Sequence, residues 1–194
     1  MFREIVQDIE KKGWSHQQHI VDQKTLATVA AHFDESFRPA QVGKGSSKDR
    51  IEEIRGDSIR WIDVLNPERE LHYFVDLIEK LKQELNREFF LGIKDFECHL
   101  AKYPQGSFYK KHLDRFSNDS SRVFSFIFYL HETWEKSDGG ELVLYDKKGE
   151  MMEKIIPVSG SMVCFMSEEI PHEVLPAKKE RRSLTGWMHT KIIN

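Results

Sequence analysis

The sequence of 194 residues suits one domain with a substantial core. Its charges nearly cancel to a net charge of -3, which excludes a general affinity for nucleic acid or anionic membranes and favours a small-molecule or protein substrate. No apolar run approaches the ~18 residues of a membrane span and the N-terminus lacks a signal-peptide layout, so we expect a cytoplasmic protein.

Three amphipathic helices are expected in the first half of the chain. Apolar residues recur at helical spacing in 2–12, which Gly13 ends, and in 23–37, which Asp22 caps, with a short strand predicted over 14–21. A third helix begins near Pro67, and its apolar stripe consists of Leu71, Phe74, Leu77, Ile78, Leu81 and Leu85. We expect this third helix to cover one side of a sheet.

Residues 38–50 have a composition that packs poorly, because glycine, serine and lysine dominate them. They predict a mobile surface loop, which serves either as a solvated linker or as a lid over a site. Residues 51–63 follow, and their second half alternates as a strand does.

From residue 94 the chain changes to short alternating segments separated by turn residues. The predicted strands cover 95–103, 108–112, 122–130, 141–145, 151–157, 161–166, a short piece near His172, and 181–191. Eight such strands favour a double-stranded β-helix (jelly roll) packed against the N-terminal helices, a mainly β fold with flanking α. We expect one domain over 1–194, in which 1–93 supply helical support and the lid, and 94–194 form the core. Cys98 and Cys164 lie inside apolar strands and are predicted to be reduced core thiols.

Strand alternation predicts which side chains share a face. In 122–130 one face is apolar, with Phe124, Phe126, Phe128 and Leu130, while the other is smaller and more polar, with Val123, Ser125, Ile127 and Tyr129. Two further strands offer polar inner faces, one with Arg181, Ser183, Thr185 and Trp187 and the other with His99, Ala101 and Tyr103. The sequence therefore predicts a ligand pocket on this side.

His112 and Asp114 form a His-x-Asp pair at a strand end, where both side chains point to one face. With His172 from a neighbouring strand they make two imidazoles and one carboxylate, the facial triad of non-haem Fe(II) oxygenases. A closed structural zinc site is disfavoured, since the set has too few protein ligands. A catalytic zinc hydrolase stays open as an alternative, although no general base is evident beside the triad.

Arg181 is the second half of the predicted site. The phase of its strand turns it inward, and no acidic residue is an evident partner. A guanidinium in a pocket requires an anion, and a ligand carboxylate offers it a bidentate grip.

These residues resemble 2-oxoglutarate and Fe(II)-dependent dioxygenases, and specifically the prolyl hydroxylase domain family whose animal members hydroxylate the hypoxia-inducible transcription factor. The resemblance rests on an ordered set of motifs: Ile54-Arg55-Gly56-Asp57-x-Ile59-x-Trp61-Ile62, Tyr103-Pro104, Tyr109-x-x-His112-x-Asp114, Tyr129-Leu130, Gly139-Gly140-x-Leu142, Pro171-His172-Glu173-Val174-x-Pro176-Ala177, and Arg181 with Trp187. The lid sequence differs from that of the animal enzymes, and their additional regulatory segments are missing.

The resemblance implies a role for each matching residue. His112, Asp114 and His172 are implied to bind Fe(II). The implied 2-oxoglutarate residues are Arg181, Tyr129, Tyr103, Trp187 and Thr185, and the implied substrate and lid residues are Arg55, Asp57 and Tyr109. O2 is the second cosubstrate, and ascorbate is an additional candidate cofactor. The expected product is a protein with a prolyl residue hydroxylated at C4, together with succinate and CO2.

Three hypotheses follow from different classes of protein. The first is a peptidyl-prolyl hydroxylase, for which elongation factor Tu is a candidate substrate by analogy with compact bacterial members. The second is a dioxygenase acting on free proline or another small metabolite, which needs no protein partner. The third is a non-catalytic oxygen or 2-oxoglutarate sensor. Neither nucleic acid nor membrane is an expected partner in any of them.

Overall fold

The computed structural model describes residues 1–40, 54–114 and 121–193. Most of the predicted lid, together with the start of the strand expected over 51–63, lies outside the described residues. The predicted loop over 38–50 is wrong at its start, where Arg38–Pro39 pair with Ile59 and Ser58 as a short strand. Nothing in the structure tests the lid itself.

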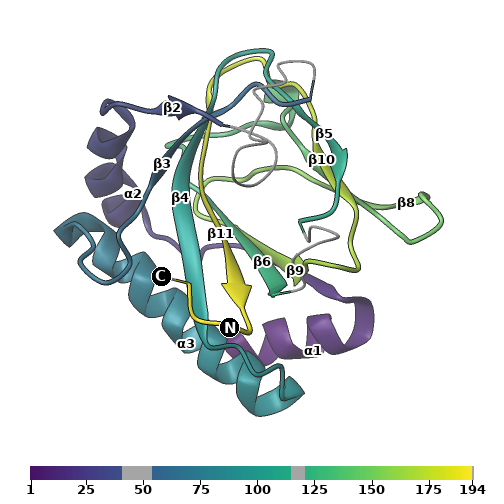
Figure 1. Cartoon of the computed structure of the whole chain (residues 1–194). Coiled ribbons are helices and arrows are strands. Elements are labelled where there is room, and N and C mark those ends of the chain that lie inside the picture. The colour runs from purple at the N-terminus through teal and green to yellow at the C-terminus, as the bar shows by residue number, and fades with distance from the viewer. Residues whose placement is uncertain (41–53, 115–120, 194) are drawn as a thin grey trace, which may run out of the picture.

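Two antiparallel sheets face one another (Figure 1). The larger has seven strands in the order β1 (Trp14–Gln17), β9 (Met162–Met166), β6 (Arg122–Tyr129), β11 (Arg181–His189), β4 (Asp95–Tyr103), β3 (Ser58–Trp61) and β2 (Arg38–Pro39). The smaller has four strands in the order β5 (Tyr109–His112), β10 (His172–Val174), β7 (Leu142–Tyr145) and β8 (Met151–Ile155). The eight strands β4 to β11 are the eight predicted for a jelly roll, and this fold prediction is confirmed.

Strand boundaries agree with the sequence prediction most closely in the C-terminal half. The long neighbours β4 and β11 pair along their whole length, from Arg181 opposite Tyr103 to His189 opposite Asp95. Strand β1 is shorter than the predicted 14–21, because the chain turns away after Gln17 towards a helix. Strands β1, β2 and β3 extend the larger sheet beyond the eight predicted strands.

The helices lie together along one side of the larger sheet (Figure 1). Helix α1 (Phe2–Lys12) ends at Gly13, whose φ of 78° is a left-handed conformation that glycine adopts freely. Helix α2 (Gln23–Ala30) is capped as predicted, since Thr25 N donates to Asp22 Oδ1 at 2.7 Å. The prediction of one helix over 23–37 was wrong at its end, where a 3₁₀ turn, Ala31–Phe33, replaces the last turns.

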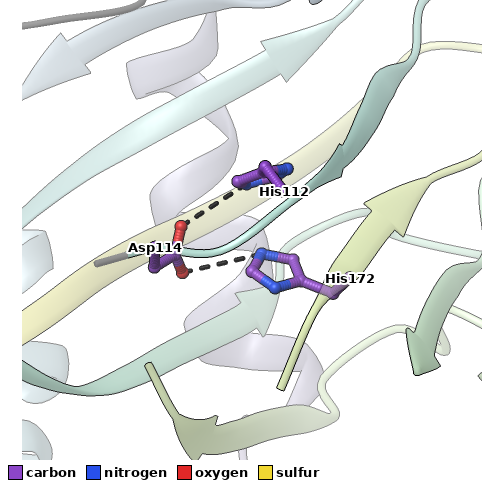
Figure 2. A group of neighbouring side chains, drawn as sticks. All are labelled: His112, Asp114 and His172. Atoms are coloured by element: carbon purple, nitrogen blue, oxygen red, sulfur yellow. Dashed lines mark ion pairs between the residues drawn. The ribbon is translucent and has the colours of Figure 1, made fainter. Parts of the chain in front are cut away.

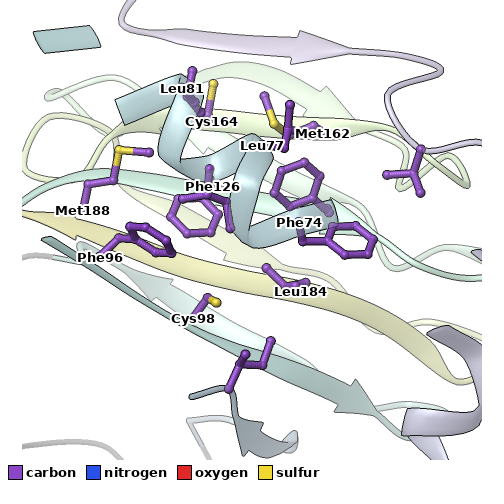
Figure 3. Close-up of a cluster of buried hydrophobic side chains, with 14 of the residues drawn as sticks. Phe74, Leu77, Leu81, Phe96, Cys98, Phe126, Met162, Cys164, Leu184 and Met188 are labelled. Atoms are coloured by element: carbon purple, nitrogen blue, oxygen red, sulfur yellow. The ribbon is translucent and has the colours of Figure 1, made fainter. Parts of the chain in front are cut away.

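Helix α3 (His72–Phe89) follows a 3₁₀ turn at Arg69–Leu71 and carries the predicted apolar stripe. Its Phe74, Leu77 and Leu81 lie over β6, β9, β11 and β4 in a cluster with Phe126 and Leu184 (Figure 3). The ring of Phe74 meets that of Phe128 edge to face, with centroids 5.5 Å apart. This cluster is the main core, and it holds the larger sheet rigidly from behind.

Both cysteines are buried and unbonded to each other, as predicted. Within the described residues, no helix is both long and apolar enough to cross a membrane.

Candidate active site

The space between the two sheets brings the three predicted metal ligands together (Figure 2). His112 is the last residue of β5 and His172 the first of β10, and antiparallel pairing sets them directly opposite one another. Asp114 follows two residues after His112. Its Oδ1 lies 3.4 Å from Nε2 of His112, and its Oδ2 lies 3.6 Å from Nε2 of His172. The three side chains thus converge on one point from two neighbouring strands.

Hydrogen bonds behind the triad fix which ring nitrogen of each imidazole faces the centre. Nδ1 of His112 lies 2.7 Å from the carbonyl oxygen of Lys110, and Nδ1 of His172 lies 3.0 Å from that of Ile170. A carbonyl only accepts, so each Nδ1 carries the proton and each Nε2 presents a lone pair towards the centre. Ser125 Oγ donates to Oδ2 of Asp114 at 2.7 Å and holds the carboxylate in place.

Electrostatics keeps Asp114 and His172 in the protonation states that a metal requires. Burial opposes ionisation of the Asp114 carboxyl, but the neighbouring His172 and His112 rings and the Ser125 hydrogen bond outweigh it and lower its pKa. Burial lowers the pKa of His172 to about 4, so its imidazole is neutral near pH 7. Two imidazoles and one ionised carboxylate, with no fourth protein ligand among the described residues, fit an open facial site for Fe(II).

A second group of metal-binding residue types, His32, Glu35 and Glu68, lies near the turn after α2. Arg60 already neutralises it, with Nη1 at 2.7 Å from Glu68 Oε1 and Nε at 3.4 Å from Glu35 Oε2. Its two carboxylates are exposed, and a cation would have to displace the guanidinium. This group does not fit a metal site.

Arg181 fits the anion-binding role predicted for it. Its side chain is 2% exposed, and its Nε donates to the carbonyl oxygen of Gly140 at 3.2 Å. Its Nη2 has no hydrogen-bond partner and no described carboxylate pairs with it, while the shielded hydroxyl of Tyr129 is also unpartnered. A buried cation beside a free hydroxyl is strongly unfavourable unless an anion binds there, so the pair fits the distal carboxylate of 2-oxoglutarate.

Gly140 has no side chain, and this allows its carbonyl oxygen to approach the guanidinium of Arg181. Its φ is 69°, and a Cβ there would lie 2.9 Å from Cβ of Ala177 and 3.1 Å from the Trp134 ring. Any larger residue would push the Gly140 carbonyl away from the guanidinium.

The remaining predicted site residues lie around the same cavity, with one exception. Arg55, Tyr103, Tyr109, Thr185 and Trp187 line the cavity together with the triad and Arg181. Asp57 stands behind this wall and holds Arg55 in a bidentate pair, with N–O distances of 2.7 and 2.6 Å. The ring of Tyr109 stacks on His112 with centroids 3.6 Å apart.

Sequence reasoning assigned no role to Ser125 or His99, although both were placed on the polar faces of their strands. Ser125 contacts Asp114, and His99 lines the cavity. Strand phase was the signal that could have found them, but phase alone does not show which polar residue reaches the metal ligands.

Comparison with known proteins agrees with this geometry. Residues 98–189 match the family model described as the 2OG-Fe(II) oxygenase superfamily. The crystal structure of a Pseudomonas putida prolyl-4-hydroxylase is similar with a TM-score of 0.86 and 39% sequence identity, over 99% of this chain and 100% of that one. The chain belongs to the 2OG-Fe(II) oxygenase superfamily. Fe(II), 2-oxoglutarate and O2 are therefore confirmed as its cofactor and cosubstrates.

Other proteins are similar to this oxygenase in structure or in sequence. A Trichoplax adhaerens prolyl hydroxylase, in complex with a hypoxia-inducible factor peptide, has a TM-score of 0.84 and 25% identity over 97% of this chain and 89% of that one. The hypoxia-inducible factor prolyl hydroxylase of Caenorhabditis elegans is 26% identical over 96% of this chain and 28% of its own length. Human Egl nine homolog 1 is 30% identical over 81% of this chain and 38% of its own length. The chain thus spans less than half the length of these two curated relatives.

Proposed function

We propose that this oxygenase hydroxylates a prolyl residue of a protein substrate, with 2-oxoglutarate and O2 consumed and succinate and CO2 released. The observation that carries the proposal is the likeness to the Pseudomonas prolyl-4-hydroxylase, which extends over essentially the whole of both chains. The metal triad and the free Nη2 of Arg181 support it, because both halves of the required site are present in one cavity.

His112, Asp114 and His172 would hold Fe(II), and Arg181 with Tyr129 would take the distal carboxylate of 2-oxoglutarate. When bound, Fe(II) supplies the redox chemistry that couples decarboxylation of the cosubstrate to insertion of one oxygen atom into a C–H bond. Tyr103 lies beside the guanidinium, whose central carbon is 5.1 Å from the centre of the tyrosine ring, and it would flank the carboxylate.

The residues at the other end of the cavity would orient the substrate and exclude water. Arg55 is fixed by Asp57 and lies 4.3 Å from the ring centre of Tyr109, which in turn packs on His112. These contacts form a rigid wall beside the metal. We propose that the wall positions the prolyl residue. Thr185 and Trp187, which the resemblance assigned to 2-oxoglutarate, would instead line the substrate end, because Thr185 lies four residues along β11 from Arg181.

Mass spectrometry of a proteome tests the proposal. Purified protein, loaded anaerobically with Fe(II) and given 2-oxoglutarate and then air, should add one oxygen atom to proline in a specific protein and release succinate. Elongation factor Tu is the first candidate substrate.

Two variants make the screen specific. His112→Ala should abolish the modification, while His72→Ala, which removes an exposed histidine at the start of α3, should retain it. Free proline and metabolite extracts are tested in parallel. Turnover of these alone, with no modified protein, would overturn the proposal in favour of a small-molecule dioxygenase.

A further inference from the structure

His99 is a buried histidine that neither the metal site nor the cosubstrate site explains. It lies in the middle of β4, is 3% exposed, and lines the cavity. Neither ring nitrogen has a hydrogen bond to any described residue, and Nδ1 is also shielded from solvent. An imidazole buried in this way costs about 1–3 kcal/mol relative to a hydrogen-bonded one. An apolar side chain would fill the place without that loss, so the residue indicates a ligand.

The surroundings of His99 place it at one end of the cavity. Its ring lies against two indoles, with centroids 4.9 Å from Trp61 and 5.4 Å from Trp187. Trp61 is 50% exposed, so this end opens to the surface, whereas Arg181 at the other end is almost completely buried. Nδ1 is shielded, and Nε2, which is not, is the nitrogen available to a bound molecule.

Strand register separates His99 from the cosubstrate. Arg181 pairs with Tyr103, and Thr185 pairs with His99, four residues further along both strands. At about 3.3 Å per residue this separation is roughly 13 Å. The five-carbon chain of 2-oxoglutarate, held at Arg181, spans only roughly half of it, since its carbon–carbon bonds are ~1.5 Å long. His99 therefore lies beyond the cosubstrate, on the side where the substrate enters.

We propose that His99 is a substrate-binding residue, whose Nε2–H donates a hydrogen bond to a backbone carbonyl oxygen of the bound peptide at the prolyl residue. This inference rests on the proposed function. Proline has no N–H, so its backbone offers only a hydrogen-bond acceptor. A side chain that recognises this backbone must therefore be a donor. The two indoles lie together beside His99, with centroids 6.4 Å apart, and supply apolar surface for the pyrrolidine ring, while the imidazole supplies the polar contact.

Burial supports a neutral donor at this position. It lowers the pKa of His99 to about 4, and the positive charge of Arg55 adds to the effect. The imidazole therefore carries one proton near pH 7. With Nδ1 facing no acceptor, the proton on Nε2 is the one that gains a partner when a peptide binds.

Two substitutions at the same position test the proposal. His99→Met fills the space without a donor, and His99→Gln restores an N–H near the place of Nε2. The probe is the synthetic form of the tryptic peptide in which the mass screen finds the added oxygen. Binding is measured by calorimetry on protein loaded with 2-oxoglutarate and Zn(II), which has no redox chemistry.

His99→Met should weaken peptide binding and raise the peptide KM roughly 5- to 10-fold, the effect of one lost hydrogen bond. His99→Gln should recover most of this loss, and the KM for 2-oxoglutarate should change less than twofold in both. A modified peptide whose binding is the same in wild type and both variants, or a change confined to the 2-oxoglutarate KM, overturns the role of His99 alone. A screen that finds no modified prolyl protein overturns the proposed function and this role with it.

Discussion

The two faces of the seven-stranded sheet carry opposite kinds of side chain, although the same strands build both. Behind the sheet, Phe126 and its buried apolar neighbours pack against α3. In front, Arg181, Tyr129, His99 and Trp187 each leave a shielded polar atom without a hydrogen bond. The back face stabilises the fold in the absence of ligand, while the front face holds polar groups whose partners are ligands. Four predictions test this contrast.

The largest effect is expected in the back face. Phe126→Ala should lower the free energy of unfolding by about 3–5 kcal/mol, because the fully buried ring leaves a cavity under α3. Urea denaturation measures it. Phe90→Ala is the matched control, since Phe90 is 88% exposed and should change stability by less than about 0.5 kcal/mol. Equal effects for the two phenylalanines would contradict the assignment of the core.

In the front face, Arg181→Met should weaken ligand binding without lowering the stability of the protein. Binding of 2-oxoglutarate should weaken by about 2–5 kcal/mol, because the carboxylate loses a buried charged partner. The metal-free, ligand-free protein should be no less stable, since an unpaired buried charge has been removed. Calorimetric titration and urea denaturation measure the two quantities. Arg182→Met, at the neighbouring half-buried arginine paired with Glu180, should retain affinity. Loss of stability without loss of affinity would mean that Arg181 is structural.

Acid should destabilise the front face through His99. The folded-state pKa of about 4, set by burial and then by Arg55, lies below the ordinary histidine pKa of 6.5. The unfolded chain therefore binds the proton first as the pH falls, and stability decreases between about pH 6.5 and 4. Metal-free wild type should lose roughly 2–3 kcal/mol more than His99→Met between pH 7 and 4.5. If the free energy of unfolding fell equally with pH in wild type and His99→Met, His99 would not be the group that titrates.

The smallest effect is expected behind the metal ligands. Ser125→Ala removes the hydrogen bond to Asp114 Oδ2 and should lower metal affinity by about 10- to 100-fold, or about 1–3 kcal/mol. Competition with a chromogenic chelator measures it, and Ser137→Ala, at an exposed serine, is the control. An unchanged metal affinity in Ser125→Ala would show that the hydrogen bond from Ser125 does not orient Asp114.

Local sequence patterns predicted the elements where one strong signal was present. The stripe of Phe74, Leu77 and Leu81 determined a helix with one buried face, and Asp22 determined where α2 begins. Alternation in β6 correctly separated the phenylalanine face from the face of Ser125 and Tyr129. It was wrong for Val123, which packs against the phenylalanine core at the end of β6, where the register with β11 shifts. The end of α2 was predicted wrongly because continued apolar spacing does not exclude a change to a 3₁₀ turn.

By itself the sequence determined the types of the metal ligands. It also determined that His112 and Asp114 lie together at one strand end and that Arg181 points inward, because these two features depend only on the two-residue period of a strand. Tertiary structure decided the rest. Only the pairing of β10 with β5 brings His172 opposite His112, and only the pairing of β11 with β4 separates His99 from the anion site. Pairing between distant strands depends on the packing of the whole chain, so no local pattern contains it.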